Sequence, residues 1–106
     1  MRQITATELS QKLQDAEPHP LLLDVREPHE FRHCRIAGSV NRPMNQVPAE
    51  IAQLDPQRET VVICHHGMRS AQVAQFLIGK GFANVINLSG GVAAWAAQVD
   101  PSMPTY

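Results

Sequence analysis

The chain has 106 residues and a formal net charge of −1 with its histidines neutral, which is the size of one ordinary domain. Hydrophobic residues make up 43% and charged residues 18%, and there is neither a basic run nor an apolar stretch long enough to span a bilayer. We therefore expect one soluble domain over residues 1–106, with no nucleic-acid or membrane partner. The segment after Met1 has no apolar signal region, which predicts a cytoplasmic protein.

The first half of the chain alternates strand patterns with helix patterns. Thr5 and Glu8 form a capping box at the start of the first helix. Asp24 interrupts an apolar run that is typical of a strand covered on both faces. The expected elements are, in order, a strand over 3–4, a helix ending near residue 15, a turn over 17–20, a strand over 21–25, a short helix over 28–31, a short strand within 37–41 and a helix over 48–54.

The second half continues the same alternation. It is expected to contain a strand over 61–63, a helix over 70–80, a strand over 85–88, a final helix that follows Gly90 and Gly91 and carries Val92 and Trp95, and an irregular tail over 100–106. Strands that alternate with helices are the signature of an α/β domain with a mainly parallel sheet. Right-handed crossovers then place helices on both faces of that sheet.

Cys64 is the residue that most strongly suggests chemistry. It directly follows the β-branched run over 61–63, and the helical pattern begins at Ser70. Gly67 allows the intervening loop to turn tightly. A thiol at this place lies at the carboxyl end of a strand, where α/β folds bind ligands. Backbone N–H groups of the loop and the helix N-terminus are expected to stabilise its thiolate.

Three segments resemble the rhodanese family of sulfurtransferases in its single-domain form. They are residues 22–31, residues 64–70 and residues 87–95, and the likeness runs from about residue 4 to residue 97. It implies a five-stranded parallel sheet between helices. The loop and the tail are similar to rhodanese domains fused to ubiquitin-activating-like adenylyltransferases.

One segment departs from the family pattern. Where the family usually has Gly-His-Ile-Pro-Gly, this chain has Cys34-Arg35-Ile36-Ala37-Gly38. Arg35 replaces a titratable group with a fixed charge, and Cys34 removes the conformational freedom of a glycine. Neither change touches the nucleophile, so the departure bears on substrate preference and not on activity.

The resemblance implies a ping-pong reaction through a persulfide on Cys64. The Cys64 thiolate attacks a small anionic sulfur donor such as thiosulfate, and cyanide or a thiol then removes the sulfur. The sulfur is carried covalently, so no cofactor or metal is expected. In an alternative relay, a protein donor such as a cysteine desulfurase supplies the sulfur and a protein acceptor takes it.

The remaining candidate site residues surround Cys64 in the loop or carry charge elsewhere. Arg69 could hold an anionic donor, or could be salt-bridged at the start of the helix. The candidates for substrate binding are His65, His66, Gly67, Met68 and Arg69, and the secondary candidates are Arg26, Arg35 and Asp24. The two histidines could add positive charge when protonated, or could be exposed without a role. Asp24 is expected to be structural, paired with backbone or with an arginine.

Other functions fit the loop less well. Cysteine-dependent phosphatases and arsenate reductases hold a whole oxyanion with five residues between cysteine and arginine, whereas Cys64 and Arg69 are separated by four. A metal site could be built from His33, Cys34, Cys64, His65 and His66, whose side chains zinc prefers. However, the adjacent His65 and His66 cannot easily converge with Cys64 from one tight loop, and no Cys-x-x-Cys pair is present. A redox pair of Cys34 with Cys64 stays open, although Cys34 is more simply a small buried hydrophobe. A non-catalytic binding domain would have less reason to keep Cys64.

Overall fold

The computed structural model describes residues 1–15 and 18–106, so residue 17 of the predicted turn lies outside the described residues. In the described part, the strands form one parallel sheet in the order β1-β5-β4-β2-β3. The strands are β1 (Arg2–Ile4), β2 (Leu21–Asp24), β3 (Val40–Asn41), β4 (Thr60–Ile63) and β5 (Val85–Leu88). The predicted strands are thus confirmed, and β4, which leads to the candidate nucleophile, is the central one.

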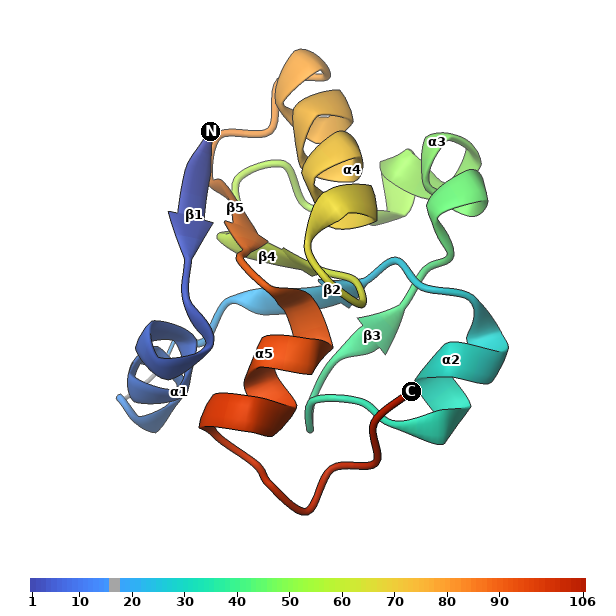
Figure 1. The fold of residues 1–106 in the computed structure, drawn as a ribbon. Helices are drawn as coiled ribbons and strands as arrows, with labels where there is room; N and C mark the ends of the chain where they lie inside the picture. The colour runs from blue at the N-terminus through green and yellow to red at the C-terminus, as the bar shows by residue number, and fades with distance from the viewer. Residues whose placement is uncertain (16–17) are drawn as a thin grey trace.

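Helices cover both faces of this sheet (Figure 1). The α-helices are α1 (Ala6–Gln14), α2 (Pro28–His33), α3 (Val47–Glu50), α4 (Met68–Gly79) and α5 (Gly91–Gln98), and the short 3-10 helices are η1 (Met44–Gln46) and η2 (Ile51–Gln53). α1 and α5 lie on one face of the sheet, and α3 and α4 lie on the other (Figure 1). This arrangement confirms the predicted α/β fold with a five-stranded parallel sheet.

Two local predictions about helices had opposite outcomes. The capping box is present as predicted: the side chain of Thr5 accepts from the Glu8 backbone N–H, and Glu8 accepts from the Thr5 N–H. The prediction of a single helix over 48–54 was wrong, because the structure has one α-helical turn between the 3-10 helices η1 and η2. A segment this short, bounded by Pro48 and Pro56, forms too few i→i+4 hydrogen bonds for a cooperative helix.

The start of α4 also differs from the prediction. The helix begins at Met68, two residues before the expected Ser70, and Gly67 is its N-cap. Gly67 has φ +103°, a conformation that side chains of L-residues rarely adopt. The positive φ lets the chain turn from the loop into the helix within one residue. As a result, the helix N-terminus directly adjoins the loop that carries Cys64.

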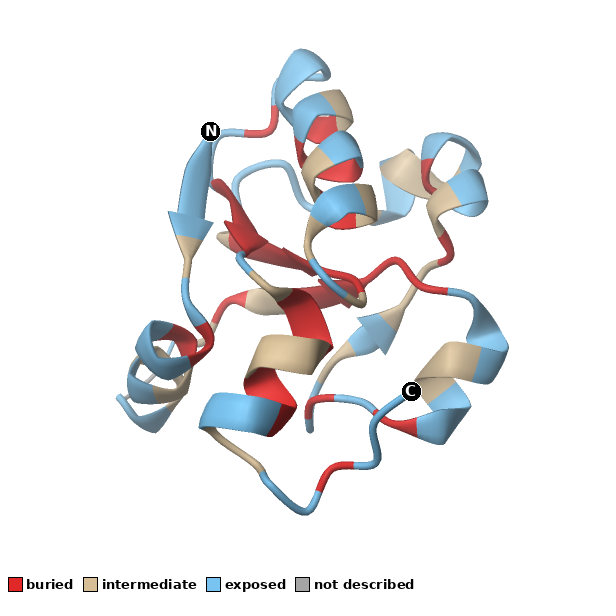
Figure 2. Ribbon diagram, in the orientation of Figure 1, coloured by how far each residue is buried: buried red, intermediate tan, exposed pale blue. Residues whose placement is uncertain are grey.

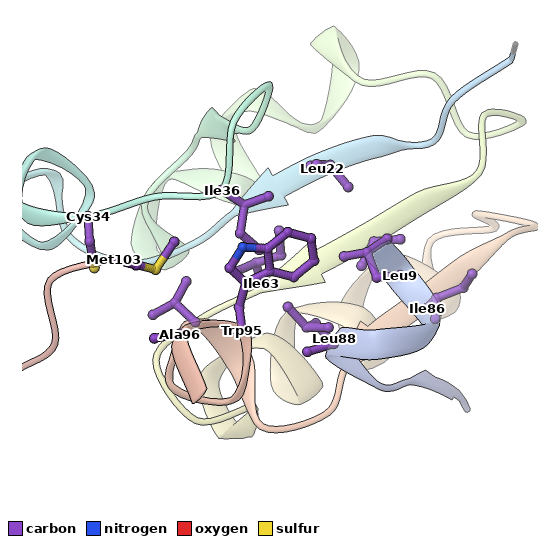
Figure 3. Close-up of a cluster of buried hydrophobic side chains, with 13 residues drawn as sticks. Leu9, Leu22, Cys34, Ile36, Ile63, Ile86, Leu88, Trp95, Ala96 and Met103 are labelled. Carbon is purple, nitrogen blue, oxygen red and sulfur yellow. The ribbon is translucent and has the colours of Figure 1, made fainter. Parts of the chain in front are cut away.

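The core consists of two clusters, one on each face of the sheet. Figure 2 shows that β2, β4 and β5 are largely buried, whereas the edge strands β1 and β3 are mostly exposed. In the cluster beneath α5, Trp95 lies beside Ile36 and Ile63 (Figure 3). Cys34 and Met103 lie at the end of this cluster, where the C-terminal tail passes (Figure 3). The tail therefore contributes to the core although it has no regular structure.

None of the described helices is both long and apolar enough to cross a membrane. Cys34 and Cys64 are free thiols, and Cys34 is a buried hydrophobe as its simpler interpretation predicted.

Candidate active site

Cys64 lies at the carboxyl end of β4, at the inner end of its loop. The residue is 1% exposed, so its thiol lies at the bottom of the loop and not at its opening. The backbone N–H of Gly67 donates a 3.0 Å hydrogen bond to Sγ of Cys64, and Oγ of Ser70 lies 3.3 Å from the same sulfur. A backbone donor and the N-terminus of α4 therefore adjoin the sulfur, which is the surrounding that stabilises negative charge.

A polar network beneath the loop fixes this geometry, and it was not foreseen from the sequence. The side-chain amide of Asn87, on β5, donates to the carbonyl oxygen of Gly67 over 3.2 Å and to the side chain of Gln3 over 3.0 Å. Since a carbonyl oxygen can only accept, the amide nitrogen of Asn87 must face the loop. The side-chain oxygen of Asn87 then accepts a hydrogen bond from the hydroxyl of Ser70. The signal in the sequence was the lone polar Asn87 inside an apolar strand.

The first turn of α5 holds the loop from the other side. The backbone N–H groups of Val92 and Ala93 donate to the carbonyl oxygens of Cys64 and His65 over 2.9 and 3.1 Å. Gly91 makes this approach possible, because a Cβ there would lie 2.3 Å from the Cys64 carbonyl oxygen. The segment that follows β5 is thus a structural support of the loop.

Arg69 forms an ion pair with Glu30, a residue of α2. Its two terminal nitrogens donate to the two carboxylate oxygens of Glu30 over 2.8 and 3.0 Å. This bidentate pairing lowers the pKa of Glu30 to about 2 and raises the pKa of Arg69. Of the two roles that the sequence left open for Arg69, the structure contains the salt bridge at the start of the helix.

The two loop histidines stack on one another and on the C-terminal tail. The rings of His65 and His66 are 3.9 Å apart between centroids, and the ring of Tyr106 lies 3.9 Å from His65 on a nearly parallel plane. Burial lowers the pKa of His65, and repulsion from His66 lowers it further. His65 is therefore expected to be neutral near pH 7, so the positive charge that the sequence left open for it is confined to lower pH. The contact with Tyr106 was not foreseen, since the tail has no regular pattern.

The secondary candidates lie outside the loop and are engaged in other contacts. Asp24 and Arg26 are fully buried, and Asp24 accepts from the backbone N–H and from the guanidinium of Arg26. This confirms that Asp24 is paired with backbone and with an arginine. Arg26 also donates to the carbonyl oxygen of Cys34 over 2.7 Å. Arg35 lies over the ring of Phe31 and donates to its carbonyl oxygen. Among the residues that the structure describes, no group of three or more His, Cys, Asp or Glu side chains converges.

The family is shown by direct comparison with known proteins. The sequence model of the family described as "Rhodanese-like domain" matches residues 5–98. The chain belongs to the rhodanese-like family. A protein of Allochromatium vinosum named "Sulfurtransferase" is 35% identical over 96 residues, which are 91% of this chain and 89% of that protein.

Related domains also occur within longer proteins. The "Adenylyltransferase and sulfurtransferase MOCS3-2" of Zea mays is 37% identical over 110 residues, covering 97% of this chain and 23% of that protein. The chain spans 38% of the length of another plant relative, so it matches only part of these proteins. The "Thiosulfate sulfurtransferase GlpE" of Shewanella oneidensis is 36% identical over 74 residues, 70% of this chain and 73% of that protein.

Solved structures agree with the fold. The crystal structure of SSP1007 from Staphylococcus saprophyticus superposes with a TM-score of 0.85 at 35% identity, and it covers 93% of this chain and 97% of that one. The rhodanese-like fold and the relation to the adenylyltransferase-linked domains, both predicted from the sequence, are thus confirmed.

Proposed function

We propose that this protein is a sulfurtransferase that carries sulfane sulfur as a persulfide on Cys64. Thiosulfate is a donor, and cyanide or a thiol is the acceptor. The observation that supports this proposal best is the 3.0 Å hydrogen bond from the Gly67 N–H to Sγ of Cys64, next to the N-terminus of α4. The names of the sulfurtransferase relatives support it as well, and family membership favours sulfur transfer over the phosphatase and arsenate alternatives.

The proposed reaction has two half-reactions at one sulfur atom. The Cys64 thiolate attacks the outer sulfur of thiosulfate, the S–S bond breaks, and sulfite leaves with the bonding electron pair. The acceptor thiolate or cyanide then attacks the outer sulfur of the persulfide and regenerates the Cys64 thiolate. The Gly67 N–H and the N-terminus of α4 stabilise the negative charge that remains on Cys64 between the two steps.

The low exposure of Cys64 limits how a donor reaches it. With 1% of Cys64 exposed, the opening through which a donor reaches its sulfur is narrow. Met68, the first residue of α4, is 76% exposed and so does not narrow this opening. Donors whose reacting sulfur projects from a narrow group are therefore favoured.

The proposal is tested by the intact mass of the protein after incubation with thiosulfate and removal of excess reagent. The wild-type protein should gain one sulfur atom, and the Cys64→Ala variant should gain none. Cys34→Ala is the matched control, because it removes the other free thiol and should still gain the sulfur. A wild-type protein without the gain, or a Cys64→Ala variant that keeps it, would contradict the proposal.

A second candidate function uses the same chemistry between proteins. In this relay, Cys64 takes sulfur from a protein persulfide and passes it to a protein acceptor, and thiosulfate reacts slowly. The support is the likeness to the Zea mays protein, in which the matching segment is 23% of an adenylyltransferase and sulfurtransferase. Rates of sulfur loading from thiosulfate and from a persulfidated cysteine desulfurase would separate the two functions. A faster rate with thiosulfate would exclude the relay as the main role.

A further inference from the structure

The ion pair between Glu30 and Arg69 has a consequence for the donor that the loop accepts. We propose that Glu30 is a specificity-determining residue, which by neutralising Arg69 makes the loop discriminate against dianionic thiosulfate in favour of thiol persulfides, which carry at most one negative charge and react as RSSH. This inference rests on the proposed persulfide chemistry at Cys64, and it adds the class of donor and the residue that selects it.

The carboxylate of Glu30 is fixed by several donors in addition to Arg69. The Glu27 backbone N–H donates to one of its oxygens over 3.0 Å, as part of a capping box at the start of α2. The Tyr106 hydroxyl donates to the other oxygen over 2.9 Å. The Glu30 side chain is 11% exposed, whereas that of Arg69 is 36% exposed. Glu30 is therefore a preorganised acceptor, and Arg69 is the more accessible partner of the pair.

The positive charge of Arg69 and the negative charge of Glu30 compensate each other. The two hydrogen bonds of 2.8 and 3.0 Å use one N–H from each terminal nitrogen of Arg69 and one oxygen each of Glu30. A bidentate pair of this kind has no net charge and resists separation. An anionic donor that approached Arg69 would meet the field of the carboxylate as well as that of the guanidinium. Arg69 thus offers much less attraction than its formal charge suggests.

The other cationic groups near the loop do not replace the lost charge. Arg26 is fully buried, and its guanidinium is paired with Asp24. Burial and the neighbouring His66 lower the pKa of His65, which keeps that ring neutral near pH 7. With Arg26, Arg69 and His65 all without net free charge, no side chain among them attracts a dianion over long range. The Gly67 N–H and the N-terminus of α4 act only at short range.

The two donor classes differ in the charge that they bring to Cys64. Thiosulfate brings two negative charges to the thiolate, and sulfite carries two away when the S–S bond breaks. A thiol persulfide brings at most one, and none in the protonated form RSSH that reacts: the Cys64 thiolate attacks its outer sulfur, the S–S bond breaks, and the leaving thiolate takes the proton of RSSH while the negative charge stays on the new persulfide. The first reaction therefore gains more than the second from a free cation at the loop.

The test compares thiosulfate with the persulfide of a small neutral thiol, using one acceptor and the ratio of the two kcat/KM values. The Glu30→Gln variant keeps the shape of the side chain and releases the charge of Arg69. The kcat/KM for thiosulfate divided by the kcat/KM for the persulfide should rise by about tenfold, which is within the range of electrostatic effects on association. Glu50→Gln is the matched control, since Glu50 forms a partly exposed ion pair with Arg42 through one hydrogen bond and its loss changes the net charge equally. That variant should keep the wild-type ratio.

A double variant checks the cause. Glu30→Gln combined with Arg69→Gln removes both charges and should bring the ratio back towards the wild-type value. An unchanged ratio in Glu30→Gln, or a ratio that stays high in the double variant, would overturn the inference.

A measurement on the wild-type protein keeps the inference falsifiable if Glu30→Gln does not fold. Between about 0.01 M and 1 M salt, where screening changes strongly, the wild-type kcat/KM for thiosulfate should not fall. A steep fall would show that an uncompensated cation attracts the donor, and would refute the role of Glu30. A wild-type protein that forms no persulfide with either donor would refute the proposed function itself. Persulfide formation with an unchanged Glu30→Gln ratio would refute only the inference.

Discussion

The phenol ring of Tyr106 lies almost parallel to the imidazole ring of His65, with 10° between the ring planes and 3.9 Å between the centroids. The same phenol accepts a 2.8 Å hydrogen bond from Arg26 and donates one to Glu30. A residue of the irregular tail thus contacts the loop of Cys64, the buried arginine and the acid that pairs with Arg69. The tail is part of the site although it contains no helix or strand.

The stack predicts that Tyr106 sets the titration of His65. In the Tyr106→Ala variant the imidazole loses its cover, so the pKa of His65 should rise towards its ordinary value of 6.5. Tyr106→Phe is the matched control: it keeps the ring and loses the hydroxyl, so the pKa of His65 should stay below that value. The measurement is an NMR titration of the His65 ring protons. Equal midpoints in the wild-type and Tyr106→Ala proteins would show that the stack does not bury His65.

Gly91 is predicted to tolerate no side chain. In Gly91→Ala the new Cβ would lie 2.3 Å from the Cys64 carbonyl oxygen and 2.4 Å from that of His65, at φ +57°. Neither contact is with a flexible side chain, so the backbone of the loop has to shift. We expect a loss of about 2 kcal/mol or more in the free energy of unfolding, measured with urea.

Two other glycines separate the contributions to this effect. Gly81 has φ +93°, and a Cβ added there would meet nothing within 4 Å, so Gly81→Ala should show only the conformational cost, about 1 kcal/mol. Gly79 is helical and also has open space, so Gly79→Ala should be neutral or stabilising by about 0.5 kcal/mol. If Gly91→Ala costs no more than Gly81→Ala, the contact with the loop is not what makes Gly91 necessary.

The buried pair of Asp24 and Arg26 is predicted to dominate the electrostatic part of stability. Asp24→Asn leaves the guanidinium of Arg26 charged and fully buried, which should cost about 3 kcal/mol or more in the free energy of unfolding. The control is Glu50→Gln, which breaks the partly exposed pair with Arg42 and should cost about 1 kcal/mol or less. Similar losses in the two variants, measured by urea unfolding, would mean that Arg26 finds another partner or water.

Glu30 is predicted to make stability depend on acid pH. Its pKa is about 2 in the folded protein and 4.5 as the ordinary value, because Arg69 and Tyr106 donate to the carboxylate. A group whose pKa is lowered on folding contributes stability above its unfolded pKa, and this contribution is lost as the pH falls towards the folded value. The free energy of unfolding should therefore decrease between about pH 4.5 and pH 2 by more in the wild type than in Glu30→Gln. Parallel curves over this window would contradict the prediction.

Much of the fold could be predicted because its signals are local. The β-branched run before Cys64 and the apolar run before Asp24 mark strands that are buried on both faces. Thr5 and Glu8 mark the start of a helix by mutual hydrogen bonds. The prediction of one helix over 48–54 failed because hydrophobic spacing does not show how few i→i+4 hydrogen bonds a segment between prolines forms.

The contacts that complete the site could not be predicted in the same way. Glu30 and Arg69 are 39 positions apart, and Glu30 and Tyr106 are 76 apart. Neither pair leaves a periodic pattern, since each depends on how separate elements pack. The sequence did indicate the thiol at the end of β4, because a strand, a cysteine and a glycine are adjacent in the chain. It left both roles of Arg69 open, because the charge of an arginine does not reveal its partner.

The place of β4 in the sheet has a consequence for how the protein opens. β4 pairs with β2 on one side and β5 on the other, while β1 and β3 form the two margins. Amide exchange in such sheets is fastest at the margins, where a strand can detach without breaking the remaining pairs. Fraying of β1 or β3 therefore leaves the strand that anchors Cys64 paired on both sides. The sulfur of Cys64 should therefore keep its position until the whole sheet unfolds.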